Sequence, residues 1–62
     1  MTAREILKEL YKDGWYMVNQ EGSHVQLKHP TKPGKVTVPR HSGDIAPGTL
    51  KRIRKQAGID KK

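Results

Sequence analysis

A chain of 62 residues predicts one domain, residues 1–62, close to the lower size limit for folding without disulfides or a bound metal. It has no cysteine, so neither a disulfide nor a thiolate metal site adds to its stability. Thirteen Lys and Arg against six Asp and Glu give a formal net charge of +7, which favours polyanionic partners, with nucleic acid first among them. No apolar run approaches the ~18 residues of a membrane span, and the charged N-terminal residues do not form a signal peptide, so we expect a soluble cytoplasmic protein.

The first expected element is a helix over residues 3–12. Thr2 and Glu5 have the spacing of a capping box, which marks a helix start. Apolar residues then recur at helical intervals: Ala3, Ile6, Leu7 and Leu10. Gly14 is the expected end of the helix.

Three strands are expected next, over residues 15–20, 24–29 and 35–38. The first is rich in aromatic and β-branched residues. Its odd-numbered and even-numbered positions both carry apolar residues, so the sequence does not predict which of the two faces the core. The other two alternate apolar and polar residues. Gly22 suits a hairpin turn between the first two strands, and the prolines and glycine of residues 30–34 predict a second turn.

An irregular loop over residues 40–46 is expected to lead into a second helix over residues 47–57. Pro47 suits the first helical turn, where its missing N–H costs nothing. Gly58 is the expected stop. Apolar residues line one side of this helix: Leu50, Ile53 and Ala57.

The predicted fold class is α+β, an α-β-β-β-α two-layer sandwich. Each helix has one apolar stripe, and a three-stranded antiparallel sheet has one apolar face to cover both, so we expect both helices on that face. The expected core consists of Ile6, Leu10, Val25, Leu27, Val36, Val38, Leu50 and Ile53. The opposite face, with His24, Gln26 and Lys28, is expected to face solvent.

Basic residues form two groups that suit contact with a nucleic-acid backbone. One lies on the polar side of the second helix: Lys51, Arg52, Arg54 and Lys55. The other lies around the strand ends: Lys28, His29, Lys32, Lys35, Arg40 and His41. The alternative for the helix is a solvated face that complements the C-terminal dipole, which accounts for its last cations but not for the first two.

The three histidines, His24, His29 and His41, are spaced by five and twelve residues, and no local metal-binding motif unites them. We therefore expect no metal and no other cofactor. The sequence also has no carboxylate cluster, nucleophile elbow or phosphate-binding loop. An enzyme built on this chain would use one histidine without a metal, and His24 beside the Gly22 turn is the candidate. The alternative is a surface histidine that bonds to the backbone.

Six short segments stand in register over nearly the whole chain: Gly14-Trp15, Gln20 to His24, Lys28-His29-Pro30, Val36 to Pro39, Pro47 to Leu50 and Gln56 to Ile59. Together they resemble the HicA family of toxins from bacterial toxin–antitoxin systems. The resemblance implies a fold like that of double-stranded-RNA-binding domains and a ribosome-independent ribonuclease that cleaves mRNA and arrests growth. It also implies a HicB-type antitoxin as inhibitor. His24 matches the catalytic histidine of the family.

The cleavage of RNA is a reaction that suits catalysis by a single histidine. RNA carries its own nucleophile, the 2′-hydroxyl, so an enzyme must remove one proton, stabilise the charge at phosphorus and protonate the leaving 5′-oxygen. An imidazole performs either proton step near neutral pH, and the choice between acid and base stays open for His24. Ser23 either orients the phosphate or only closes the turn. The expected RNA contacts are Ser23, Lys28, His29, Lys35, Arg40, Lys51, Arg52 and Lys55.

Two other interpretations remain beside the ribonuclease. In a non-catalytic RNA-binding module, His24 would only contact ribose or phosphate. A DNA-binding protein is a weaker interpretation, because no helix-turn-helix pair presents a recognition helix. For the toxin, we expect the antitoxin to cover His24 and to present carboxylates to the surrounding cations, in competition with RNA.

Overall fold

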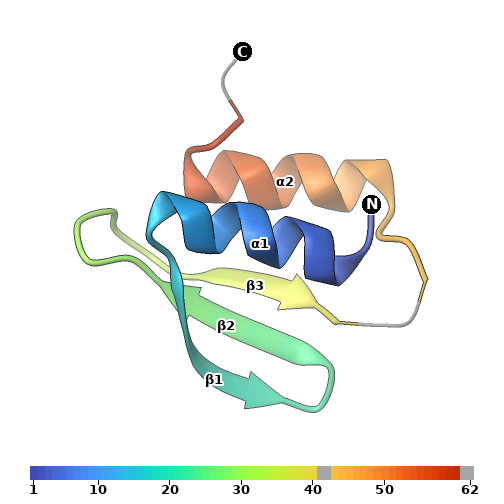
Figure 1. Ribbon diagram of the computed structural model, residues 1–62, viewed down its shortest axis with the longest axis horizontal. Coiled ribbons are helices and arrows are strands. Elements are labelled where there is room, and N and C mark those ends of the chain that lie inside the picture. Colours follow the sequence, from blue (N-terminus) through green and yellow to red (C-terminus); the bar gives the residue numbers. More distant parts are fainter. Residues whose placement is uncertain (41–42, 61–62) are drawn as a thin grey trace.

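The computed structural model describes residues 1–40 and 43–60. Figure 1 shows the elements in chain order: α1 (Ala3–Asp13), β1 (Tyr16–Glu21), β2 (His24–Lys28), β3 (Val36–Pro39) and α2 (Pro47–Ala57). The predicted α+β order is confirmed, and no boundary moves by more than one residue. Neither helix is long and apolar enough to cross a membrane, as far as the described residues go.

Helix α1 is bounded by the two signals that the sequence contains. Thr2 Oγ1 accepts a hydrogen bond from the Glu5 N–H at 3.3 Å, and the Thr2 N–H donates to Glu5 Oε1 at 2.8 Å. Gly14 ends the helix with φ 107°, where its N–H points to the carbonyls of Leu10 and Tyr11. A Cβ at position 14 would also lie 2.8 Å from His29 Nε2. Position 14 therefore requires glycine for two reasons: the positive φ angle and the lack of space for a Cβ atom.

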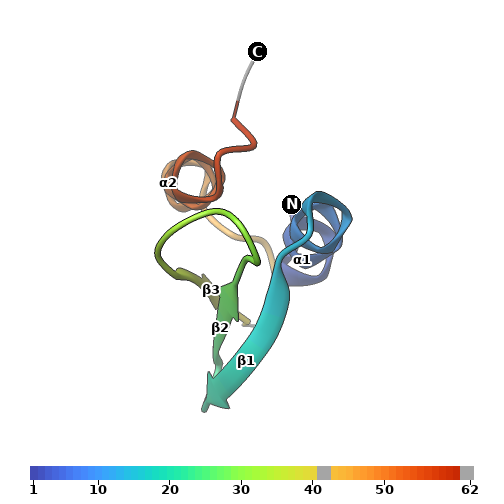
Figure 2. The ribbon, with the colours of Figure 1, turned by 90° about the vertical axis from the view of Figure 1, so that its left-hand side faces the viewer.

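The strands form one antiparallel sheet in the order β1-β2-β3. Val25 pairs with Val38 and Leu27 with Val36, so the apolar residues of β2 and β3 point to one face. Both helices cover this face (Figure 2). All eight expected core residues are buried, and five others join them: Ala3, Leu7, Trp15, Ile45 and Ala57. The two-layer packing predicted from the apolar pattern is confirmed.

Strand β1 is exposed along its whole length, unlike β2 and β3. It forms the edge of the sheet farthest from the helices (Figure 1). The register shifts between Met17 and Asn19, which places Val18 in a β-bulge. Of the strand expected over residues 15–20, Trp15 is buried in the core just before β1. Within β1 neither set of side chains is buried, because the helices do not cover this strand.

Candidate active site and nucleic-acid interface

His24 is the first residue of β2 and directly follows the turn formed by Gly22 and Ser23. Gly22 has φ 57°, in the left-handed region that tight hairpin turns require. In the sheet ladder, His24 lies opposite Glu21 of β1 and opposite Pro39 of β3. The turn therefore presents an exposed imidazole on the uncovered face, at one end of the sheet.

Glu21 is the cross-strand neighbour of His24 at the candidate site. Directly opposite residues of an antiparallel pair have Cβ atoms about 4.5–5.5 Å apart and point to the same face. The Glu21 carboxylate and the His24 imidazole therefore leave the sheet side by side. The available signal was the turn itself, because a two-residue hairpin turn pairs the residues before and after it.

The cations of the sheet lie at its two ends. Lys28 shares the uncovered face with His24 but stands four residues along β2, about 13 Å away, with Lys35 next to that same end. Arg40 follows β3 at the other end, and its N–H donates to the carbonyl of Ser23. Ser23 directly precedes His24 and the backbone of Arg40 meets the same turn, whereas Lys28 and Lys35 lie at the other end of the sheet.

Helix α2 carries three exposed cations of the predicted RNA surface: Lys51, Arg52 and Lys55. Because α2 lies on the covered side of the sheet, they do not share one flat surface with His24 (Figure 2). RNA in contact with both would pass around the edge of the sheet. Arg54 has another role, because its Nε lies 3.4 Å from Glu9 Oε1 and joins the two helices.

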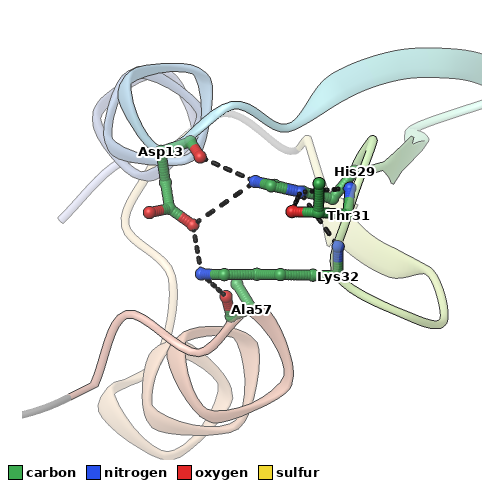
Figure 3. A network of polar contacts seen from close by, with 5 residues as sticks. All are labelled: Asp13, His29, Thr31, Lys32 and Ala57. Carbon is green, nitrogen blue, oxygen red and sulfur yellow. Dashed lines mark hydrogen bonds and ion pairs between the residues drawn. The ribbon is translucent and has the colours of Figure 1, made fainter.

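His29 is part of a network of polar contacts at the C-terminal end of α1 (Figure 3). Its Nε2–H donates to the Asp13 carbonyl at 2.7 Å, and its Nδ1 accepts from the backbone N–H groups of Thr31 and Lys32, each at 3.1 Å. The side chain is 9% exposed, and its ring lies edge-on to the Trp15 ring with 5.2 Å between the two ring centroids. The RNA contact by His29 stays a prediction, and both of its ring nitrogens are engaged within the protein.

Lys32 completes the network in Figure 3. Its Nζ contacts Asp13 Oδ2 and donates to the carbonyl of Ala57 at 2.9 Å. One ammonium thus joins the C-terminal ends of both helices to the connection between β2 and β3. The hydrogen bond from Lys32 holds the pKa of Asp13 below its usual value.

Asp13→Asn should lower the free energy of unfolding at neutral pH, because it removes the ion pair with Lys32. The pKa of Asp13 is lower in the folded protein than in the unfolded chain, where it is about 3.9. The stabilisation is therefore complete above that pH and is lost as the pH falls through the folded value. Melting temperatures of the wild type and the variant should converge in acid. A difference that stays constant across this range would contradict the assignment.

No group of three or more His, Asp or Glu side chains is placed to hold a metal ion within residues 1–40 and 43–60. His41 of the predicted basic group lies outside the described residues. His24 and His29 also differ in surroundings, because one begins a strand on the uncovered face and the other is packed against Trp15. The histidine available to a substrate in the described structure is therefore His24.

A family model described as the HicA toxin of bacterial toxin-antitoxin systems matches residues 3–59 of the chain. The search of curated protein sequences found no match to the chain. The matched range contains all five helices and strands and the turn before His24. The resemblance noted in the sequence is confirmed.

Proposed function

Because the chain belongs to the HicA family, the toxins of bacterial toxin–antitoxin systems, we propose that it is a metal-independent endoribonuclease that cleaves mRNA in the cytoplasm. The observation that carries the proposal is the place of His24. It stands at a tight turn on the uncovered sheet face of a domain with net charge +7. That charge holds RNA, and the imidazole supplies the proton transfer that cleavage requires.

The reaction needs no group beyond the RNA and the protein. The 2′-oxygen attacks the adjacent phosphorus, the bond to the 5′-oxygen breaks, and the products carry a 2′,3′-cyclic phosphate and a 5′-hydroxyl. The proton lost by the 2′-hydroxyl balances the proton gained by the 5′-oxygen, and His24 serves as general acid or base in these steps. The net charge of +7 offsets the charge that develops at phosphorus. Ser23 orients the phosphate next to His24.

The remaining cations hold the RNA on either side of the cleaved bond. Lys28 and Lys35 bind a phosphate farther along the uncovered face, at the other end of β2. The exposed cations of α2 bind RNA that passes around the sheet edge: Lys51, Arg52 and Lys55. Such contacts position the strand without selecting a sequence.

The test of this function is cleavage of a labelled mRNA by the purified protein in the presence of EDTA. We expect defined fragments, with rates that EDTA does not change. Binding without cleavage would instead indicate the non-catalytic RNA-binding module. Cleavage that stops in EDTA and returns with a divalent cation would overturn the metal-independent reaction.

The family implies an antitoxin partner, and we place a HicB-type antitoxin over the uncovered sheet face. A protein seated there would occlude His24 and present carboxylates to Lys28, Lys35 and Arg40, in competition with RNA. The complex should protect His24 from chemical modification and should weaken as salt screens the charge pairs at its rim. RNA that binds the complex as tightly as the free toxin, with His24 still reactive, would contradict this arrangement.

A further inference from the structure

A hollow of about 450 Å³ lies on the flank of α1, lined by Arg4, Leu7, Lys8, Tyr11 and Arg40. Its volume is within the range of small-molecule sites in proteins. The four helical residues recur at spacings of three and four, so they form one stripe along α1. Arg40 lines the same hollow from the end of β3.

The hollow concentrates positive charge. Arg4, Lys8 and Arg40 are exposed, and none of them forms an ion pair within the part of the chain that the structure describes. Lys32 and Arg54 differ, because each is bound to a carboxylate of α1. No acidic side chain of the described residues lines the hollow. Three cations without a counter-charge suit the phosphate groups of a nucleic acid.

Tyr11 adds an aromatic surface to these charges. This residue is 48% exposed, although it follows directly on the buried Leu10. Leu7, which is 6% exposed, supplies an apolar floor one turn earlier. An exposed aromatic ring beside cations is the combination on which proteins stack the bases of single-stranded nucleic acids.

Arg40 connects the hollow to the candidate active site. Its N–H donates to the carbonyl of Ser23, and the preceding residue, Pro39, pairs with His24. The Arg40 side chain itself lines the hollow. An RNA strand whose phosphate lies at His24 therefore has a basic path around the end of the sheet to α1.

We propose that this hollow is a nucleotide subsite for single-stranded RNA, in which a base stacks on Tyr11 and the three cations contact phosphates. The inference rests on the proposed ribonuclease function, because it extends the path of the same RNA strand beyond His24. A base within a duplex is covered by its neighbours and does not offer its face to Tyr11. The subsite therefore selects unpaired segments next to the cleaved bond.

The test measures the affinity of a fluorescent single-stranded RNA for proteins that carry His24→Ala, so that cleavage does not interfere. Adding Tyr11→Ala should weaken binding at least about fivefold, whereas Tyr11→Phe should retain the affinity. Met17→Ala is the control, because Met17 is 49% exposed but lies in β1 opposite Leu27, on the other sheet face from Lys28. It should change the affinity less than about twofold. Lys8→Gln should reduce the salt slope by about 0.7, the value for one phosphate contact on a single strand.

Equal effects of Tyr11→Ala and Met17→Ala would overturn the subsite, as would equal losses on single-stranded and duplex RNA. Weaker antitoxin binding with unchanged RNA affinity would also overturn it and would assign the hollow to the antitoxin. Circular dichroism of each variant is the control for folding and should match that of the wild type. If the wild type does not cleave RNA but Tyr11→Ala still weakens the binding of single-stranded RNA, the ribonuclease function is wrong and the subsite is retained.

Discussion

His24→Ala should lower the rate of RNA cleavage by about 10²–10⁴-fold and abolish growth arrest on expression, because the imidazole supplies the proton transfer of the reaction. The side chain is exposed at the first residue of β2, outside the core. Its removal should therefore leave the thermal unfolding transition nearly unchanged. The measurements are the cleavage rate of a labelled mRNA and the growth of cells expressing each variant.

Gln26→Ala is the matched control, because Gln26 is the next residue of β2 on the same face as His24. It should cleave RNA at a rate close to that of the wild type. Full cleavage by a folded His24→Ala protein would remove the imidazole from the reaction. An equal loss in both variants would indicate damage to the surface rather than to a catalytic group.

A single 2′-deoxy substitution at the cleaved position should block the reaction completely, because the proposed nucleophile is then absent from the RNA. The binding affinity should change little, since the phosphates and bases that contact the protein remain. The same substitution one nucleotide away serves as the control and should leave cleavage intact. Continued cleavage at a 2′-deoxy position would show that the nucleophile is water or a protein group.

The order and bounds of the elements could be predicted because their signals are local. The capping box at Thr2 and Pro47 at the start of the second helix each act within a few residues. The alternation in β2 and β3 identified the buried face, because each strand is covered on one side. For β1 the alternation gave no answer because both sets are apolar, and the strand lies at an edge that the helices do not reach.

The site was predicted less completely, because charge alone does not reveal a tertiary partner. His29 and Arg54 looked like surface cations in the sequence, but the carbonyl of Asp13 and the carboxylate of Glu9 engage them from distant positions. The hollow on α1 was missed for the same reason, since Arg40 joins the helical stripe only through the fold. His24 was accessible to prediction because its turn, its strand and its family motif coincide.

The most direct test of the account is mass spectrometry of the fragments that the wild-type protein produces from a defined RNA. Attack by the 2′-hydroxyl leaves a 2′,3′-cyclic phosphate on one fragment and a 5′-hydroxyl on the other, and we expect both ends at every cleavage position. Fragments with a 3′-hydroxyl and a 5′-phosphate would contradict the account, because they require water as the attacking group.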